Sequence, residues 1–433
     1  MTAQSSFKKI LNNALIVLSG NMGANIFGLL SVAIFTHSMG AEIFGYYVLF
    51  LTFIEIIDKI FNFQTWQAFI KYATDFQVRD EEHNLMMLLK YSFLIDFFSL
   101  SIAFIVAFFS VDMFIGFFNI PIEYTSLVTI MAISILFRVF EISTGIFRLF
   151  DEFKIQSRIL VYVAIIKFLI FGVIAIISPS FENFIYATVF TQSIAFAMKI
   201  YYSKQILNQN GYKISQIIKE TINHKLIKEL KIFSFIVYNN FDVAVRMVSR
   251  QLDIVILGKL YGAEVVGIYN IAKEIAGIIA KLTDPIYQAI YPEFAKLLAN
   301  GKKLEAKQVA IKILKYAGLA GLGFYILFII FGKFSINLAF GSEFEPAYEI
   351  VLIYFIAIFI AIISLPLVPL LHSKGLAKQA FTNQILATIG YVLVIYPLIY
   401  MYSAVGSAIS YIIFYIIWLV LTVKTIKRNE VFM

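Results

Sequence analysis

Long apolar segments, most of them twenty residues or more, recur along the whole chain and dominate what it can fold into. About twenty apolar residues span a bilayer as a helix, and lipid offers no hydrogen-bond partner to an open backbone. The sequence therefore predicts an all-α, polytopic membrane protein. We place about twelve transmembrane helices at residues 10–37, 44–71, 85–110, 122–148, 156–178, 182–207, 232–258, 264–291, 309–333, 346–371, 376–401 and 404–424.

The composition and the missing motifs exclude several classes of protein. Only 14% of the residues are charged, against roughly 25% in a typical soluble domain. There is no cysteine, the four histidines are scattered, and no phosphate-binding loop, metal motif or nucleophile turn is present. We therefore expect no metal, no cofactor and no enzymatic activity. The first apolar segment is too long for a signal peptide and is retained as a helix.

The distribution of basic residues predicts the orientation. With the N-terminus in the cytoplasm, most of the 35 lysines and arginines lie in cytoplasmic loops and helix ends, and only Lys259 and Lys333 fall outside. Cytoplasmic loops of membrane proteins carry such an excess. Both termini are therefore expected on the cytoplasmic side of the membrane. The net charge of +8 reflects this topology, so we expect no nucleic-acid partner.

One motif occurs twice, as "GAEIFGYY" at residues 40–47 and as "GAEVVGIY" at residues 262–269. The lysine-rich linker 208–231 divides the chain into an N-lobe, 1–207, and a C-lobe, 232–433, each with six helices. Both copies then lie at the outer turn between the first two helices of their lobe. Two parallel six-helix lobes are typical of transporters, with the substrate bound where the lobes meet.

Basic residues also lie inside the predicted helices, where they need a special explanation. A charge at the bilayer centre costs about 2.5–3.5 kcal/mol, so several facing lipid would cost more than a fold can bear. They must face water, a partner or a ligand. The basic residues at membrane depth are Lys59, Arg138, Lys167, Arg246, Arg250, Lys273 and Lys281.

The choice of arginine suggests what they bind. The chain has seven arginines against 28 lysines, yet three of the seven lie at membrane depth. A guanidinium binds phosphate or carboxylate in a bidentate manner, which lysine cannot do. We predict an anionic substrate in a cationic cavity. The candidate substrate-binding residues are Arg246, Arg250, Arg138, Lys59, Lys281, Lys167, Asn21 and Asn25.

Acidic residues accompany these cations. The candidates for ion coupling or for salt bridges to the cations are Asp242, Glu141, Asp58, Glu55 and Glu274. An ordinary structural role is the competing interpretation, because Asp242 with Arg246, and Arg138 with Glu141, have the spacing of salt bridges within one helix.

The segments "MGAEIFGYYVLF" and "SRQLDIVILGKLYGAEVVGIYNIAKEI", the latter continuing to "IYPEF", resemble the oligosaccharide flippases of bacterial surface-polysaccharide synthesis, of the O-antigen or capsule type. That family belongs to a superfamily shared with multidrug exporters and lipid II flippases. The resemblance implies a V-shaped, two-lobed transporter. It would move undecaprenyl-pyrophosphate-linked oligosaccharide units from the inner to the outer leaflet of the bacterial inner membrane by alternating access. A polysaccharide polymerase and chain-length machinery are the partners it implies.

Other functions stay open at this point. Multidrug exporters of this superfamily commonly carry an acidic residue on the first helix, whereas no acid lies between Phe7 and Glu42 here. A cavity rich in arginine and lysine would also repel a cationic drug. A membrane-embedded polysaccharide polymerase is less favoured, because it would need a sizeable outer loop and the long loops here are inside. A non-transporting scaffold would leave the charges within the helices unexplained.

Overall fold

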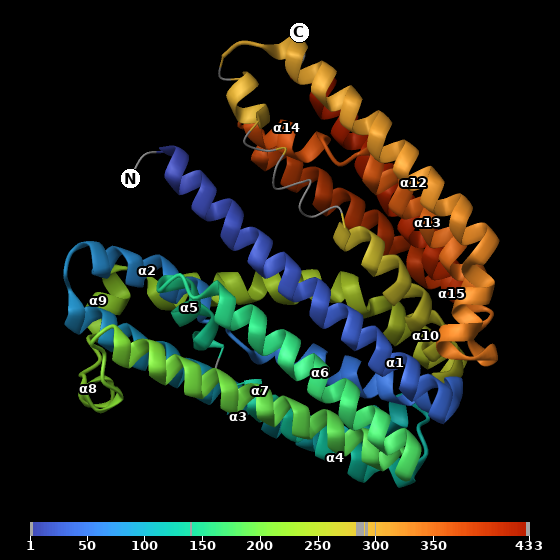
Figure 1. The fold of residues 1–433 in the computed structure, drawn as a ribbon, viewed down its shortest axis with the longest axis horizontal. Helices are drawn as coiled ribbons and strands as arrows, with labels where there is room; N and C mark the ends of the chain where they lie inside the picture. Colours follow the sequence, from blue (N-terminus) through green and yellow to red (C-terminus); the bar gives the residue numbers. More distant parts are fainter. Residues whose placement is uncertain (1–2, 139–140, 283–289, 291–292, 299, 430–433) are drawn as a thin grey trace. The chain divides into compact units, whose positions relative to one another are not determined.

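Helices are the regular elements of the structure, a computed structural model that describes residues 3–138, 141–282, 290, 293–298 and 300–429 (Figure 1). This confirms the predicted all-α fold. The α-helices are α1 (Ala3–Phe61), α2 (Trp66–Val78), α3 (Glu82–Phe118), α4 (Thr125–Ile133), α5 (Ile142–Leu149), α6 (Phe153–Ile177), α7 (Phe181–Gln209), α8 (Ile214–Lys219), α9 (His224–Glu229), α10 (Ile232–Leu282), α12 (Lys303–Phe340), α13 (Ala347–Ile363), α14 (Leu367–Ser373) and α15 (Ala377–Arg428). Short 3₁₀ helices are η1 (Ile122–Tyr124), η2 (Ser134–Arg138) and η3 (Ser342–Phe344).

Eight helical stretches in the described residues are long and apolar enough to cross a membrane. Three of them contain a residue with non-helical backbone angles, at Gly40 in α1, Gly262 in α10 and Ser403 in α15. Each of these breaks falls between two predicted spans, which is why one continuous element covers both. The finding confirms a polytopic membrane protein.

The repeated motif has the same backbone in both copies. Gly40 has φ 76° and ψ −178°, and Gly262 has φ 81° and ψ −173°. Positive φ is strained for residues with a Cβ and readily adopted by glycine. The motif is therefore a sharp turn that separates two helices, and the first glycine of each copy is required by its geometry.

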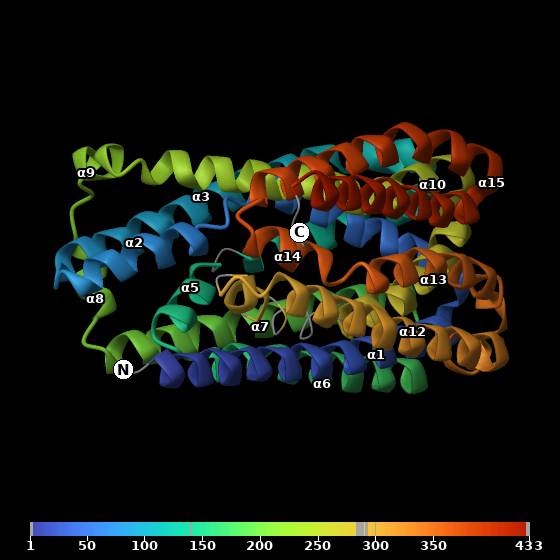
Figure 2. The ribbon, with the colours of Figure 1, turned by 90° about the horizontal axis from the view of Figure 1, so that it is seen from above.

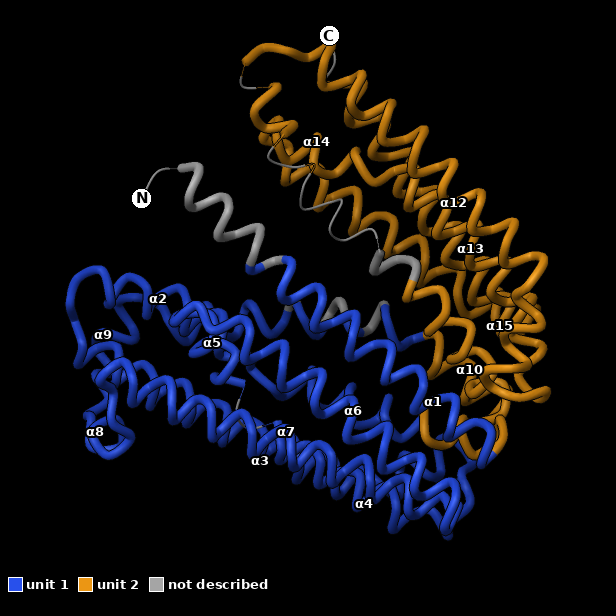
Figure 3. The backbone as a smooth tube through the Cα atoms, viewed as in Figure 1, with its two compact units in different colours: residues 1–39, 49–252 blue, residues 40–48, 253–433 orange. Residues whose placement is uncertain are grey.

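The chain divides into two compact units, coloured separately in Figure 3. Unit 1 comprises residues 1–39 and 49–252, and unit 2 comprises residues 40–48 and 253–433. The first copy of the motif thus belongs to unit 2, although the helices on either side of it belong to unit 1. The lobes 1–207 and 232–433 stay a prediction from the sequence.

The predicted linker is folded against unit 1. Its helices α8 and α9 bury Ile217 and Ile227 in the apolar cluster that α2, α3 and α5 also build. The ammonium group of Lys90 on α3 donates to the backbone carbonyl oxygens of Ile218, at 2.7 Å, and Glu220, at 2.8 Å. These contacts anchor the linker on the helices of one unit.

In unit 2 the two copies of the motif pack against each other. A Cβ placed on Gly45 would lie 1.7 Å from the carbonyl oxygen of Ala263. A Cβ on Gly267 would lie 2.3 Å from the carbonyl oxygen of Ala41. Each copy therefore places its second glycine on the backbone of the other, which is the close helix approach that small residues permit. The helix α13 of this unit packs against both α12 and α15 (Figures 1 and 2).

A carboxylate holds the first of these turns. Glu343 of η3 accepts a hydrogen bond from the backbone N–H of Ala41 at 2.7 Å, directly after the turn at Gly40. An acceptor at a helix N-terminus satisfies an open N–H group and interacts well with the helix dipole.

We expect Glu343→Ala to lower the free energy of unfolding by about 1 kcal/mol, measured by thermal unfolding in detergent. Glu343→Gln keeps an acceptor and should lose less. An unchanged unfolding midpoint in Glu343→Ala would show that the bond contributes nothing.

Candidate substrate-binding site

The candidate site begins where a predicted span breaks. The helix α1 ends at Phe61 and α2 begins at Trp66. The side-chain amide of Asn62 donates to Asp58 at 3.1 Å, and its oxygen accepts the backbone N–H of Gln64 at 3.2 Å. Gln64 has a positive φ of 41°, so the chain turns sharply here. The amide of Asn62 fixes the last turn of α1, which carries Asp58.

Asp58 is the centre of an ion cluster in unit 1. Its Oδ2 accepts hydrogen bonds from Arg138 Nη1 at 2.8 Å and from Lys59 Nζ at 3.0 Å. The Asp58 side chain is 1% exposed, whereas those of Arg138 and Lys59 are each 27% exposed. A buried carboxylate therefore binds two cations that still reach solvent.

This cluster corrects one pairing suggested by helical spacing. Arg138 pairs with Asp58 on α1, and Glu141 pairs instead with Lys199 on α7, at 3.6 Å. Helical spacing predicts contacts only between residues of the same helix. Arg138 is the last residue of the 3₁₀ helix η2 and Glu141 directly precedes α5, and each of them pairs with a residue of another helix.

A second buried carboxylate contacts the starts of two helices, α2 and α5. Asp96 of α3, which is fully buried, accepts the hydroxyl of Thr65 at 2.7 Å and the backbone N–H of Ile142 at 3.0 Å. Thr65 immediately precedes α2, and Ile142 is the first residue of α5. Asp96 was not among the predicted site residues. Its signal in the sequence was that of a lone acid within a very apolar span, which by itself marks a functional or structural site.

A polar cavity of about 280 Å³ lies next to the ion cluster. It is close to the lower end of the roughly 300–1,000 Å³ of small-molecule pockets. Its lining comes from α1, α2 and α10, and Lys59 belongs to both the cluster and the cavity. The lining residues are Glu55, Lys59, Gln67, Asn239, Val243, Met247 and Arg250.

The charges around this cavity are mixed, with cations in excess. Lys59 and Arg250 line it together with one acid, Glu55, which accepts a hydrogen bond from the amide of Gln251 at 2.7 Å. The adjacent Arg138 shares Asp58 with Lys59. Among the described side chains at the site, three cations therefore face two acids. The site suits an anionic group but is partly neutralised by its own carboxylates.

The other predicted residues lie apart from this cavity or outside the described side chains. Lys167 of α6 stacks over the ring of Phe171 at 5.0 Å. Asn21 and Asn25 lie on α1, and Glu274 is exposed in unit 2. The side chains of Asp242, Arg246 and Lys281 lie outside the described part, so their roles stay predictions.

Unit 2 contains a polar cluster of its own, which the candidate residues also omitted. The fully buried Asp253 accepts two hydrogen bonds from Lys273 Nζ, at 2.9 and 3.0 Å, and one from the hydroxyl of Tyr269. The Tyr269 hydroxyl also contacts those of Tyr354 and Ser407. Tyr269 is the last residue of the second motif copy. The motif therefore contributes both the glycine contact and a member of this network.

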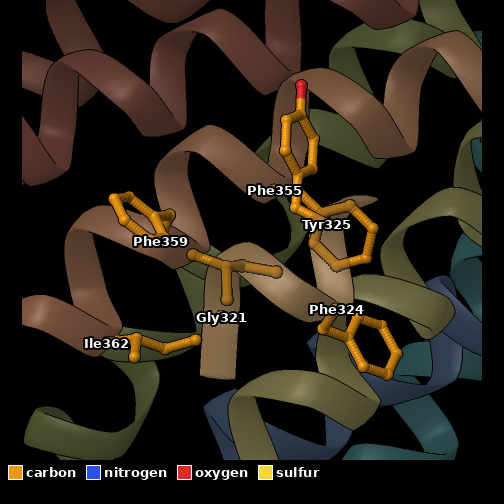
Figure 4. A pocket seen from close by; sticks show the side chains of 7 residues that line it. Gly321, Phe324, Tyr325, Phe355, Phe359 and Ile362 are labelled. Atoms are coloured by element: carbon orange, nitrogen blue, oxygen red, sulfur yellow. The ribbon is translucent and has the colours of Figure 1, made fainter. Parts of the chain in front are cut away.

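The small pocket between α12 and α13 is of a different kind. Aromatic side chains surround it, among them Phe324, Tyr325, Phe355 and Phe359 (Figure 4). Its volume is about 10 Å³, room for at most a single water. It is a packing gap and is excluded as a substrate site.

Comparison with known proteins places the chain in a family. The sequence profile described as "Polysaccharide biosynthesis protein" matches residues 10–298. The chain belongs to the polysaccharide biosynthesis protein family. The match covers the predicted N-lobe from residue 10 onward, the linker and both copies of the motif. No curated protein sequence matches this family member significantly.

Solved structures show which fold the family member has. An inward-facing multidrug resistance MATE family transporter of the MOP superfamily superposes with a TM-score of 0.74 at 11% identity, covering 96% of this chain and 98% of that one. The lipid II flippase MurJ in an inward closed conformation gives 0.68 at 14% identity, with coverages of 95% and 87%. The Vibrio cholerae MATE transporter VcmN in its bent form gives 0.60 at 13% identity, with 100% of both chains covered.

These comparisons confirm the predicted membership of a polysaccharide-biosynthesis family and the predicted transporter fold. At such low identities the structural likeness concerns the fold alone. Both flippases and drug transporters share it, so the substrate has to be inferred from the residues of the site.

Proposed function

We propose that the protein is a flippase for undecaprenyl-pyrophosphate-linked oligosaccharide repeat units. It moves them from the inner to the outer leaflet of a bacterial inner membrane by alternating access. It performs no covalent chemistry and needs no cofactor, so the energy comes from an ion gradient or from the gradient of the substrate itself. Both chain termini lie in the cytoplasm. A polysaccharide polymerase and chain-length machinery on the far side of the membrane would use the product.

The observation that carries the proposal is the pair of cations on Asp58 beside the polar cavity. Arg138 and Lys59 are partly exposed, and Lys59 and Arg250 line the cavity. A diphosphate offers several oxygens, to which a guanidinium donates two parallel hydrogen bonds and an ammonium adds a point charge. The cavity is large enough for a head group, while the lipid and the sugars would extend beyond it. Membership of a polysaccharide-biosynthesis family supports the same substrate class.

An exporter of small molecules is the second candidate, because MATE transporters have the same fold. Glu55 lines the cavity and could face a cationic drug. The excess of cations over acids at the site opposes this function, since like charges repel in a site of low dielectric constant.

Transport in reconstituted vesicles separates the two candidates. The purified protein would be placed in liposomes that contain an undecaprenyl-diphosphate saccharide with a fluorescent label on the sugar. A membrane-impermeant reductant added outside bleaches only the outer leaflet in protein-free vesicles, and an active flippase should extend bleaching to nearly all of the label. Ethidium uptake into the same vesicles is the parallel measurement. Ethidium transport without movement of the labelled lipid would show that the protein is an exporter and not a flippase.

A further inference from the structure

Asp58 occupies the position that an anionic ligand would need. Both cations of the cluster direct their charged groups at this single carboxylate, through Arg138 Nη1 and Lys59 Nζ. In the part of the chain that the structure describes, Asp58 is the acceptor of the hydrogen bonds that Arg138 and Lys59 donate. A diphosphate that accepts from Arg138 Nη1 and Lys59 Nζ in the same directions would therefore compete with Asp58.

We infer that Asp58 is an internal counter-anion that the substrate's diphosphate displaces from Arg138 and Lys59, and that returns to them when the product leaves. This inference rests on the proposed flippase function. Diphosphate carries more charge and more acceptor oxygens than one carboxylate, so it wins the exchange while it is in the cavity. Asp58 keeps the amide of Asn62 as a donor during that time.

The exchange has a functional reason. A transporter must bind its substrate and also release it. Cations that held the substrate and the product equally tightly would trap the product. A resident carboxylate lowers the affinity for the anion and offers the cations a partner after release. The exposure of the side chains permits this exchange. Asp58 is 1% exposed, whereas Arg138 and Lys59 are each 27% exposed and can be reached by a ligand.

The opposite role would be that Asp58 only orients the two cations for the ligand. The two roles predict opposite changes in the affinity for the anion when the charge of Asp58 is removed. Removing a competitor tightens anion binding, whereas removing a positioning group weakens it. Asp58→Asn keeps the shape and one acceptor oxygen but removes the charge, which makes it the decisive variant.

The experiment measures binding of undecaprenyl diphosphate to the full chain in nanodiscs of zwitterionic phospholipid, together with flipping in vesicles. Asp58→Asn should bind about tenfold more tightly, the equivalent of one charge-assisted hydrogen bond, and should flip more slowly because release is delayed. Asp75→Asn, an exposed aspartate of α2 in the same unit, is the matched control and should behave like the wild type. Equal or weaker binding by Asp58→Asn would overturn the inference.

A second pair of variants covers the case in which Asp58→Asn does not fold because two cations are left without a partner. Lys59→Gln and the double variant Lys59→Gln/Asp58→Asn both keep Arg138 as the cation. The double variant should bind undecaprenyl diphosphate more tightly than Lys59→Gln, and the reverse order would overturn the inference. If neither the wild type nor any variant binds this lipid, the proposed substrate class itself is wrong. Binding by the wild type without tightening in the variants rejects only the role of Asp58.

Discussion

Alanine in place of Gly45 should lower the free energy of unfolding by about 3 kcal/mol or more, beyond the usual cost of an added methyl group in a packed core. The new Cβ would lie 1.7 Å from the carbonyl oxygen of Ala263. That obstacle is backbone, so no rotation of a side chain relieves it. The two copies of the motif would have to separate, and the reciprocal contact of Gly267 with Ala41 would be lost as well.

The measurement is thermal unfolding and monodispersity in detergent, read beside the amount of protein inserted into the membrane. Gly277→Ala is the matched control, because Gly277 lies in α10, the helix that carries Ala263, and a Cβ there meets nothing within 4 Å. A helical glycine replaced by alanine should be neutral or gain about 0.5–1 kcal/mol. Wild-type unfolding of Gly45→Ala would mean that the two motif copies do not pack as closely as described.

Arg138→Gln should reduce flipping of the lipid-linked saccharide by about ten- to a hundredfold, the range expected from losing a charged hydrogen-bond partner worth about 1.5–3 kcal/mol. The side chain of Arg138 is 27% exposed, so its loss leaves no large cavity in the core. Asp58 keeps Lys59 and Asn62 as donors, and the fold should persist. We therefore expect Arg138→Gln to lower the flipping rate while the stability of the fold is retained.

Two further variants sharpen this expectation. Arg138→Lys keeps the charge but not the planar fork, and should retain part of the activity. Arg158→Gln removes an exposed arginine of α6 in the same unit and should flip at the wild-type rate. Full activity in well-inserted Arg138→Gln protein would show that this cation does not contact the substrate.

The architecture was accessible from the sequence because the bilayer permits few solutions. Apolar length alone predicted the long helices, and eight helical stretches of the described residues are long and apolar enough to cross a membrane. The doubled motif located two breaks, which the structure places at Gly40 and Gly262 with nearly equal dihedral angles. The third break, at Ser403 in α15, has no such motif. Its place was still indicated by the boundary between two apolar segments.

The sequence predicted the cations that lie at the candidate site, but it did not predict the ion pairs that they form. Lys59, Arg138 and Arg250 were identified because a charge within a span is costly wherever it is unpaired. The partner of Arg138 is Asp58, on a helix that is distant in sequence, and helical periodicity carries no information about contacts between helices. Asp96 accepts from a hydroxyl and from a backbone N–H at the starts of α2 and α5. The places where α2 and α5 begin are set by the fold, so the periodicity could not reveal their contact with Asp96.

The glycine contact between the two motif copies also bears on how such a chain could arise. Residue i of one copy meets residue j of the other, and residue j of the first meets residue i of the second, as Gly45 with Ala263 and Gly267 with Ala41. That reciprocity is the rule of an isologous interface in a two-fold symmetric dimer. A half-length ancestor with a single copy would have made the same contact between two identical subunits. Gene duplication and fusion would then have converted a concentration-dependent association into an intramolecular one, after which each copy was free to diverge.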